Sequence, residues 1–169
     1  TEFEIAYSVS RMAIQDAGID KSQIGAVLGA AHIMGGEYNT EVVFGRLPEA
    51  LGLRTCQVTG QTVSGGASSH SIRRTAEGIL RAGEAEYVLI VHSQRFSQFT
   101  MNEQAQYFAV AGSDLEFEVP YGMTYNALAA MVTQGYMSQT GTTVEQVASV
   151  VVACNKWARL QENAMFRDK

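Results

Sequence analysis

A stretch rich in glycine and serine, "SGGASS", is the part of the sequence that most suggests chemistry. It runs from Ser64 to Ser69 and opens a segment with helical spacing that starts near Gly65. The first N–H groups of a helix carry about half a positive charge, which suits an acyl thioester, an oxyanion or a phosphate. His70 lies one turn into this helix. The alternative is that the glycines only allow a tight turn and close packing of the helix.

Other candidate groups are two histidines, two cysteines and the glycine pattern itself. The stretch lacks the spacing of the common nucleotide-binding glycine motifs, so we do not expect nucleotide hydrolysis. His32 and His92 each end a predicted strand, and we interpret both as structural rather than catalytic. Cys56 lies within a predicted strand and Cys154 on the apolar face of the last helix, so both are expected to be structural. They show no metal spacing and fit reduced thiols in a cytoplasmic protein.

Composition limits the class of protein. The chain has 46% apolar and 17% charged residues, and this composition predicts one globular domain with a sizeable core. The formal charge is −5 and no basic cluster exceeds Arg73-Arg74, so we expect neither nucleic acid nor an anionic membrane as a partner. No signal peptide or membrane-length apolar run is visible. Because the chain begins inside a helical pattern without Met, we expect a piece of something longer.

Alternating helices and strands must position the glycine-rich stretch. The expected elements are a helix at 5–17 capped by Gly18, a strand at 24–32, a helix from Asn39 or Thr40 weakened by Gly45 and Pro48, a strand at 55–60, a helix at 65–82 and a strand at 86–93. The helix at 65–82 has an apolar face of Ile72, Ala76, Ile79 and Leu80, with Arg73, Arg74, Glu77 and Arg81 turned outward. This order predicts an α/β fold of βαβ units around a mainly parallel sheet.

The second half of the sequence begins with an aperiodic segment. Residues 96–114 are polar and aromatic, and we interpret 96–125 either as an excursion over the site or as a poorly ordered loop. A helix follows at 126–140 and ends at Gly141. Thr142 or Thr143 then opens a last helix, with Glu145 or Gln146 completing a capping box. Its expected buried stripe is Val147, Val150, Val151, Cys154 and Ala158.

Three segments in this order resemble the N-terminal half of thiolases. They are "DAGIDKSQIGAVLGA", "GGASSHSIRRTAEGILRAGEAEYVLIVHSQRFS" and "VPYGMTYNALAAMVTQGYMSQTGTTVEQVASVVVACNKWA". The most specific parts are "ILRAGEAEYVLIV" and "YMSQTGTTVEQVASVVV". The chain is most similar to the branch with the sterol-carrier-protein thiolases and the lipid-transfer-protein-like aldolases. It has "LQENAMFRD" where the family has an Asn-Pro dipeptide.

The resemblance implies a thiolase-like fold, in which two βαβ-rich halves form an αβαβα layered sandwich. Residues 1–169 would be a partial N-terminal domain without the first strand. The resemblance also implies Claisen chemistry on acyl-CoA thioesters, with the thioester as substrate and no further cofactor or metal. In the family a cysteine at a helix start takes the acyl group, and acid/base groups come from the C-terminal half. The implied partners are a second copy of the chain and, as in similar proteins, a small partner subunit.

Counting back without gaps from "RAG" and "VLIV" places the family's nucleophile at Gly66, which has no side chain. Three functions stay open: an acyl-CoA-processing enzyme of thiolase type (acetyl-CoA acetyltransferase or lipid-transfer protein), a retro-aldolase acting on a CoA-linked side chain, and a non-catalytic binder of acyl-CoA or lipid. We expect the substrate to contact Ser64, Gly65, Ala67, Ser68, His70, Tyr121 and Met123. If no further segment supplies acid/base groups, we expect this chain alone to be inactive.

Overall fold

The computed structural model describes residues 1–30, 40–95, 97, 99–109 and 112–168. The chain divides into two compact units, Thr1–Ala111 and Gly112–Lys169, and each is described by itself. The first unit contains the helices α1 (Glu2–Ala17), α2 (Thr40–Leu51), α3 (Ser68–Ala82) and α4 (Met101–Ala109), the short 3₁₀ turns η1 (Lys21–Gln23) and η2 (Gly65–Ala67), and the strands β1 (Ile24–Ala30), β2 (Val58–Thr62) and β3 (Tyr87–Val91). The second contains η4 (Val119–Tyr121), α5 (Tyr125–Thr140) and α6 (Val144–Ala158).

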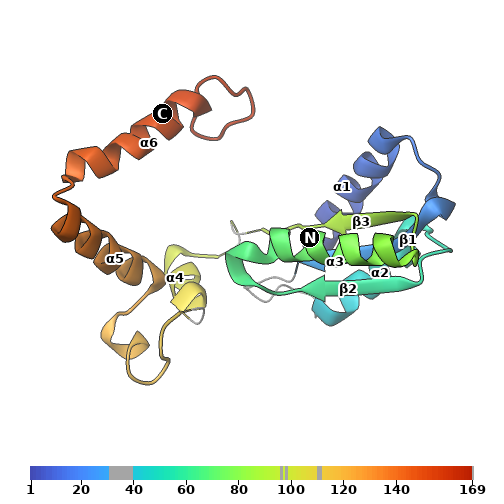
Figure 1. Cartoon of the computed structure of the whole chain (residues 1–169), viewed down its shortest axis with the longest axis horizontal. Coiled ribbons are helices and arrows are strands. Elements are labelled where there is room, and N and C mark those ends of the chain that lie inside the picture. The colour runs from blue at the N-terminus through green and yellow to red at the C-terminus, as the bar shows by residue number, and fades with distance from the viewer. Residues whose placement is uncertain (31–39, 96, 98, 110–111, 169) are drawn as a thin grey trace. The chain divides into compact units, whose positions relative to one another are not determined.

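The first unit is built on a parallel three-stranded sheet in the order β2-β1-β3. Helices α1 and α2 pack together on one face, and α3 covers the other (Figure 1). The expected α/β class and parallel sheet are therefore confirmed. The helix that we expected at 65–82 is also present, as η2 followed directly by α3.

The central strand β1 is buried on both faces, as expected for a parallel strand between helical layers. Val27 packs with residues of α1 and α2, whereas the next residue, Leu28, packs with Ile72 and Ala76 of α3. Side chains alternate between the faces of a strand, so these two neighbours join the sheet to its two helical layers. Burial on both faces explains why β1 is a continuous apolar run, whereas a strand buried on one face would alternate apolar and polar residues.

Gly25 marks an irregularity in β1. Ile24 pairs with Tyr87 and Ala26 with Val88, so Gly25 is an extra residue between two pairs, as in a β-bulge. A Cβ atom added at Gly25 would lie 2.9 Å from the Cβ atom of Ala85. The close approach of β1 to the segment before β3 therefore requires glycine at this position.

The sequence analysis placed two features of the first unit inaccurately. The second strand begins at Val58 rather than Thr55, so Cys56 precedes the strand instead of lying within it. The Cys56 N–H donates to the Leu53 carbonyl at 3.3 Å, which shows that the chain is still turning there. The second feature is α4, which forms inside the segment interpreted as aperiodic. Thr100 and Glu103 exchange hydrogen bonds at its start, in the manner of a capping box.

In α1 the helix is confirmed, with Gly18 as its left-handed cap, but the apolar spacing of Ile5, Val9, Met12, Ala13 and Ala17 does not mark the buried face. The buried side chains are Ala6, Ser10 and Ile14, each one helical turn from the next. Met12 is 66% exposed. Spacing locates an apolar stripe, whereas the position of the sheet decides which side of the helix is covered.

The second unit consists mainly of α5 and α6, whose ends match the sequence analysis. Gly141 ends α5 with a left-handed backbone, and Thr143 and Gln146 form the capping box of α6. The expected buried stripe of α6 was wrong. Val150 is 64% exposed and Cys154 is exposed, because no described residue of the second unit covers this face of the helix. In the described ranges, no helix combines the length and apolar character that crossing a membrane requires.

We predict that Gly25→Ala destabilises the fold by about 1–3 kcal/mol, because the added methyl group would collide with Ala85. The matched control is Gly60→Ala in β2, where an added Cβ atom would meet only Leu28 Cδ2 at an ordinary 3.5 Å. Urea unfolding followed by circular dichroism measures both. A Gly25→Ala protein as stable as the Gly60→Ala protein would contradict the close approach.

Candidate functional site

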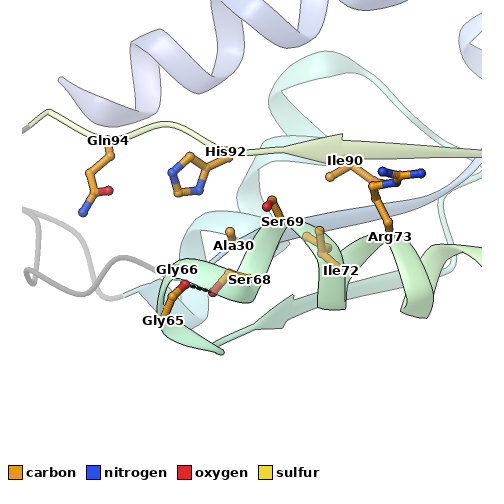
Figure 2. Close-up of a pocket in the computed structure, with 10 residues that line it drawn as sticks. All are labelled: Ala30, Gly65, Gly66, Ser68, Ser69, Ile72, Arg73, Ile90, His92 and Gln94. Carbon is orange, nitrogen blue, oxygen red and sulfur yellow. Dashed lines mark hydrogen bonds between the residues drawn. The ribbon is translucent and has the colours of Figure 1, made fainter. Parts of the chain in front are cut away.

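A cavity of about 490 Å³ lies between the start of α3 and the end of β3 (Figure 2). One wall comes from η2 and α3 and the other from β1, β3 and the residues after β3. The lining residues on the helical side are Gly65, Gly66, Ser68, Ser69, Ile72 and Arg73, and those on the strand side are Ala30, Ile90, His92 and Gln94. This is the end of the sheet at which the parallel strands finish, where ligands of open α/β sheets usually bind.

Residue spacing explains why these side chains meet. Gly66, Ser69 and Arg73 follow each other at three and four residues, so they share one face of the helix. Ile90, His92 and Gln94 alternate along β3 and its continuation, and all three line the cavity. Figure 2 shows the imidazole of His92 and the amide of Gln94 on the side of the cavity opposite Gly66.

The turn that leads into α3 is held by Ser68. Its hydroxyl group donates a hydrogen bond to the Gly65 carbonyl at 2.7 Å, drawn as a dashed line in Figure 2, and accepts one from the Ser64 N–H at 2.9 Å. Ser68 is buried and its oxygen is engaged in both directions. We therefore assign Ser68 to holding the turn, which leaves it poorly suited to act as a nucleophile.

The two glycines of the turn have different roles. Gly65 has a φ angle of +53°, a left-handed conformation that residues with a Cβ atom adopt at a cost. Gly66 is not among the residues with positive φ, and a Cβ atom added there would meet no atom of the described residues within 4 Å. The tight-turn explanation therefore holds for Gly65 but does not account for Gly66. A side chain at Gly66 would have room at the cavity wall.

The start of α3 has no side-chain cap. The N-cap residue is Ala67, whose methyl group cannot accept a hydrogen bond, and no capping bond is made there. Most helices satisfy some of their first N–H groups with a Ser, Thr, Asp or Asn side chain at this position. The N–H groups of Ala67 and Ser68 already donate to the Ser64 and Gly65 carbonyls, so a ligand oxygen at the cavity would take other N–H groups of this turn.

Ser69, Arg73, His92 and Gln94 were not among the residues that the sequence analysis assigned to the site. The Nε2 atom of Gln94 is buried and has no hydrogen-bond partner within the described residues, so it leaves a donor at the cavity wall. His92 was interpreted as structural, yet it lines the cavity. The alternation of 90, 92 and 94 was visible in the sequence, but only the fold shows that this side of the strand faces α3.

The expected site residues are only partly brought together. Gly65, Gly66 and Ser68 line the cavity, and Ser64 and Ala67 belong to the same turn. His70 instead lines a neighbouring hollow on the outer side of α3. Tyr121 and Met123 belong to the second unit, in which Tyr121 is 86% exposed. His32 lies outside the described residues.

The cysteines do not contribute to the cavity lining. Cys56 donates a hydrogen bond from Sγ to the Val58 carbonyl at 3.5 Å, and burial raises the pKa of its thiol, which keeps it protonated at neutral pH. Cys154 lies exposed in the second unit. Across the ranges that the structure describes, no group of three or more His, Cys, Asp or Glu side chains is arranged to hold a metal ion.

Comparison with known proteins adds no family assignment: no family model matches the chain, and no curated protein matches it. The resemblance to thiolases therefore rests on the three sequence segments described above.

We predict that the thiol of a Gly66→Cys protein has a pKa below the ordinary value of about 8.5, because the uncapped helix start stabilises the thiolate. It should react with iodoacetamide faster than Cys56, whose thiol pKa is raised by burial. The pH dependence of alkylation, read by peptide mass spectrometry, measures both thiols in one sample. A Gly66→Cys thiol with a pKa at or above about 8.5 would contradict an anion-stabilising helix start.

Proposed function

We propose that this protein is thiolase-like and acts on acyl-CoA thioesters without the usual nucleophilic cysteine. The observation that carries the proposal is the position of Gly66. The residue matched to the family's nucleophile lies on a cavity wall, at a helix start without a side-chain cap, where no described residue occupies the place of a side chain. Composition and spacing alone would not have predicted that coincidence, because they do not place position 66 beside a cavity.

In the proposed site the thioester carbonyl oxygen lies against the N–H groups at the start of α3. Negative charge develops on this oxygen whenever the carbonyl is attacked or enolised, and each well-placed donor contributes about 3–4 kcal/mol to the transition state. Gln94 Nε2 is a further donor at the same cavity. The helix start can thus stabilise an oxyanion even though position 66 has no group to carry an acyl chain.

The fold is compatible with this assignment at a coarse level. A parallel sheet with helices on both faces is one half of what the αβαβα arrangement of thiolases requires. The second half, and the acid/base groups that the family takes from it, are part of the proposal. In a thiolase-like arrangement, the proposed second half would pack on the face of α3 that points away from the sheet.

Retro-aldol cleavage is the second candidate, and the glycine at position 66 favours it over classical thiolysis. In a β-hydroxyacyl thioester, the bond between the α and β carbons breaks and its electron pair becomes an enolate on the thioester oxygen. The β-hydroxyl group gives its proton to a general base and becomes a carbonyl group, and the enolate then takes a proton at its α carbon. No acyl-enzyme forms, so this reaction needs an oxyanion-binding helix start and the acid/base groups of the proposed second half, but no nucleophile. A scaffold that binds acyl-CoA without catalysis is the third candidate.

We predict that the protein forms no covalent acyl-enzyme with acetyl-CoA or acetoacetyl-CoA. Gly66 has no side chain, Ser68 is held in the turn by two hydrogen bonds, and Cys56 does not line the cavity. Incubation with each thioester followed by intact-mass spectrometry should show the unmodified mass. The Gly66→Cys protein, treated in parallel, shows whether an adduct would be detected. A stoichiometric acetyl adduct that free CoA removes and that maps to Ser64, Ser68 or Ser69 would overturn the assignment of Gly66.

We also propose that the chain forms a homodimer through β2. This strand pairs only with β1 in the sheet, so its outer edge has no strand partner among the described residues. An exposed edge strand favours pairing with another chain, and in similar proteins the equivalent strand pairs across a two-fold axis. Sedimentation velocity at micromolar concentration should show a dimer. The Gln57 N–H donates to the Gly25 carbonyl of β1, so by alternation the Gly60 N–H lies on the outer edge of β2. Gly60→Pro, which removes that N–H, should weaken the dimer, and a wild-type monomer would contradict the proposal.

A further inference from the structure

Arg73 is placed to bind an anion at the far end of the cavity from Gly66. It lies seven residues after Gly66, which corresponds to about 10 Å along a helix axis. Figure 2 shows its side chain extending from α3 to the side of Ile90. Arg73 also lines the neighbouring hollow, together with His70, Arg74 and Glu77. Its guanidinium group is thus accessible from the cavity and from solvent.

The charges on α3 leave Arg73 without an ion pair. Glu77 pairs with Arg81 at 2.6 Å and with Arg74 at 3.8 Å, both on the outer side of the helix. No ion pair of Arg73 occurs among the described residues. This surplus positive charge stands out in a chain whose formal net charge is −5. A guanidinium group presents a rigid pair of donors that matches a carboxylate.

Between the two ends of the cavity the lining is mostly apolar, although Ser69 also contributes to it from the helical side. Ile72, Ile90 and Ala30 line this part of the cavity, and none of their side chains can form a hydrogen bond. A hydrocarbon chain fits such a wall, whereas the two amides of a pantetheine arm would lose hydrogen bonds to water there. The arrangement therefore favours an acyl chain with an anionic end over the phosphate end of CoA.

From these three observations we propose that the site selects acyl-CoA thioesters whose acyl chain ends in a carboxylate, with Arg73 as the partner of that carboxylate. This inference rests on the proposed function, because it takes the thioester carbonyl to lie at the start of α3. The hydrocarbon part of the chain lies along Ile72 and Ile90. Arg73 acts as a specificity residue and takes no part in bond breaking.

The test compares octanoyl-CoA with the half-thioester of octanedioic acid, which differs only by its terminal carboxylate. Isothermal titration calorimetry should show that the wild-type protein binds the half-thioester of octanedioic acid about fivefold to tenfold more tightly than octanoyl-CoA. Arg73→Gln should remove this preference, so that the two thioesters bind with equal affinity. Arg74→Gln is the matched control, because Arg74 is next in sequence but does not line the cavity. It should keep the preference.

Each other outcome contradicts the inference in a different way. If Arg73→Gln weakens both esters equally, Arg73 contacts the CoA phosphates and the carboxylate assignment is wrong. If the wild-type protein binds the two esters equally, the inference fails while the proposed function stands. If neither ester binds, the proposed function fails as well. The preference should also shrink as NaCl is raised, which tests the charge pairing in the wild-type protein without any variant.

Discussion

Burial of β1 on both faces is the constraint on which the first unit depends. Val27 on one side and Leu28 on the other join the two helical layers to a single strand. Each fully buried side chain of this size contributes about 1.5–3 kcal/mol, so a strand that uses both faces anchors two layers at once. Because Ile72 packs against Leu28, the start of α3 is held beside the end of the sheet. The cavity is a consequence of that placement.

The turn into α3 adds a local constraint to this arrangement. Gly65 supplies the left-handed backbone, and the Ser68 hydroxyl ties the turn to the helix through two hydrogen bonds. Together they direct the helix start at the cavity, although no residue in the turn carries a reactive group. The geometry of an anion-stabilising site is therefore maintained independently of what occupies position 66. This separation is what makes enolate chemistry, or binding alone, a reasonable alternative to acyl transfer.

The sequence predicted what is determined locally. The capping box of Thr143 and Gln146 and the left-handed ends at Gly18 and Gly141 follow from contacts within a few residues, and the structure confirms them. Alternating helices and strands likewise predicted the parallel sheet. The start of α4 carries the same kind of local signal, Thr100 three residues before Glu103, which the sequence analysis overlooked.

Features that depend on contacts between distant segments could not be predicted in the same way. His92 and Gln94 became cavity residues only because α3 packs on their side of the sheet, which alternation along a strand does not specify. The apolar stripe of α6 was correctly periodic, but periodicity does not say whether anything covers it. The burial of Ala6 rather than Met12 in α1 has the same origin, since the sheet selects which side of the helix is covered.

The most direct test of the account is to locate a bound thioester by NMR. Titration of ¹⁵N-labelled protein with octanoyl-CoA should give its largest amide shift changes at Gly66, Ser68 and Ser69, where the helix start would meet the carbonyl oxygen, with smaller changes at His92. The changes should saturate with a single dissociation constant. Shift changes confined to other faces of the first unit or to the second unit, with the start of α3 unaffected, would contradict the central claim that this helix start binds the thioester.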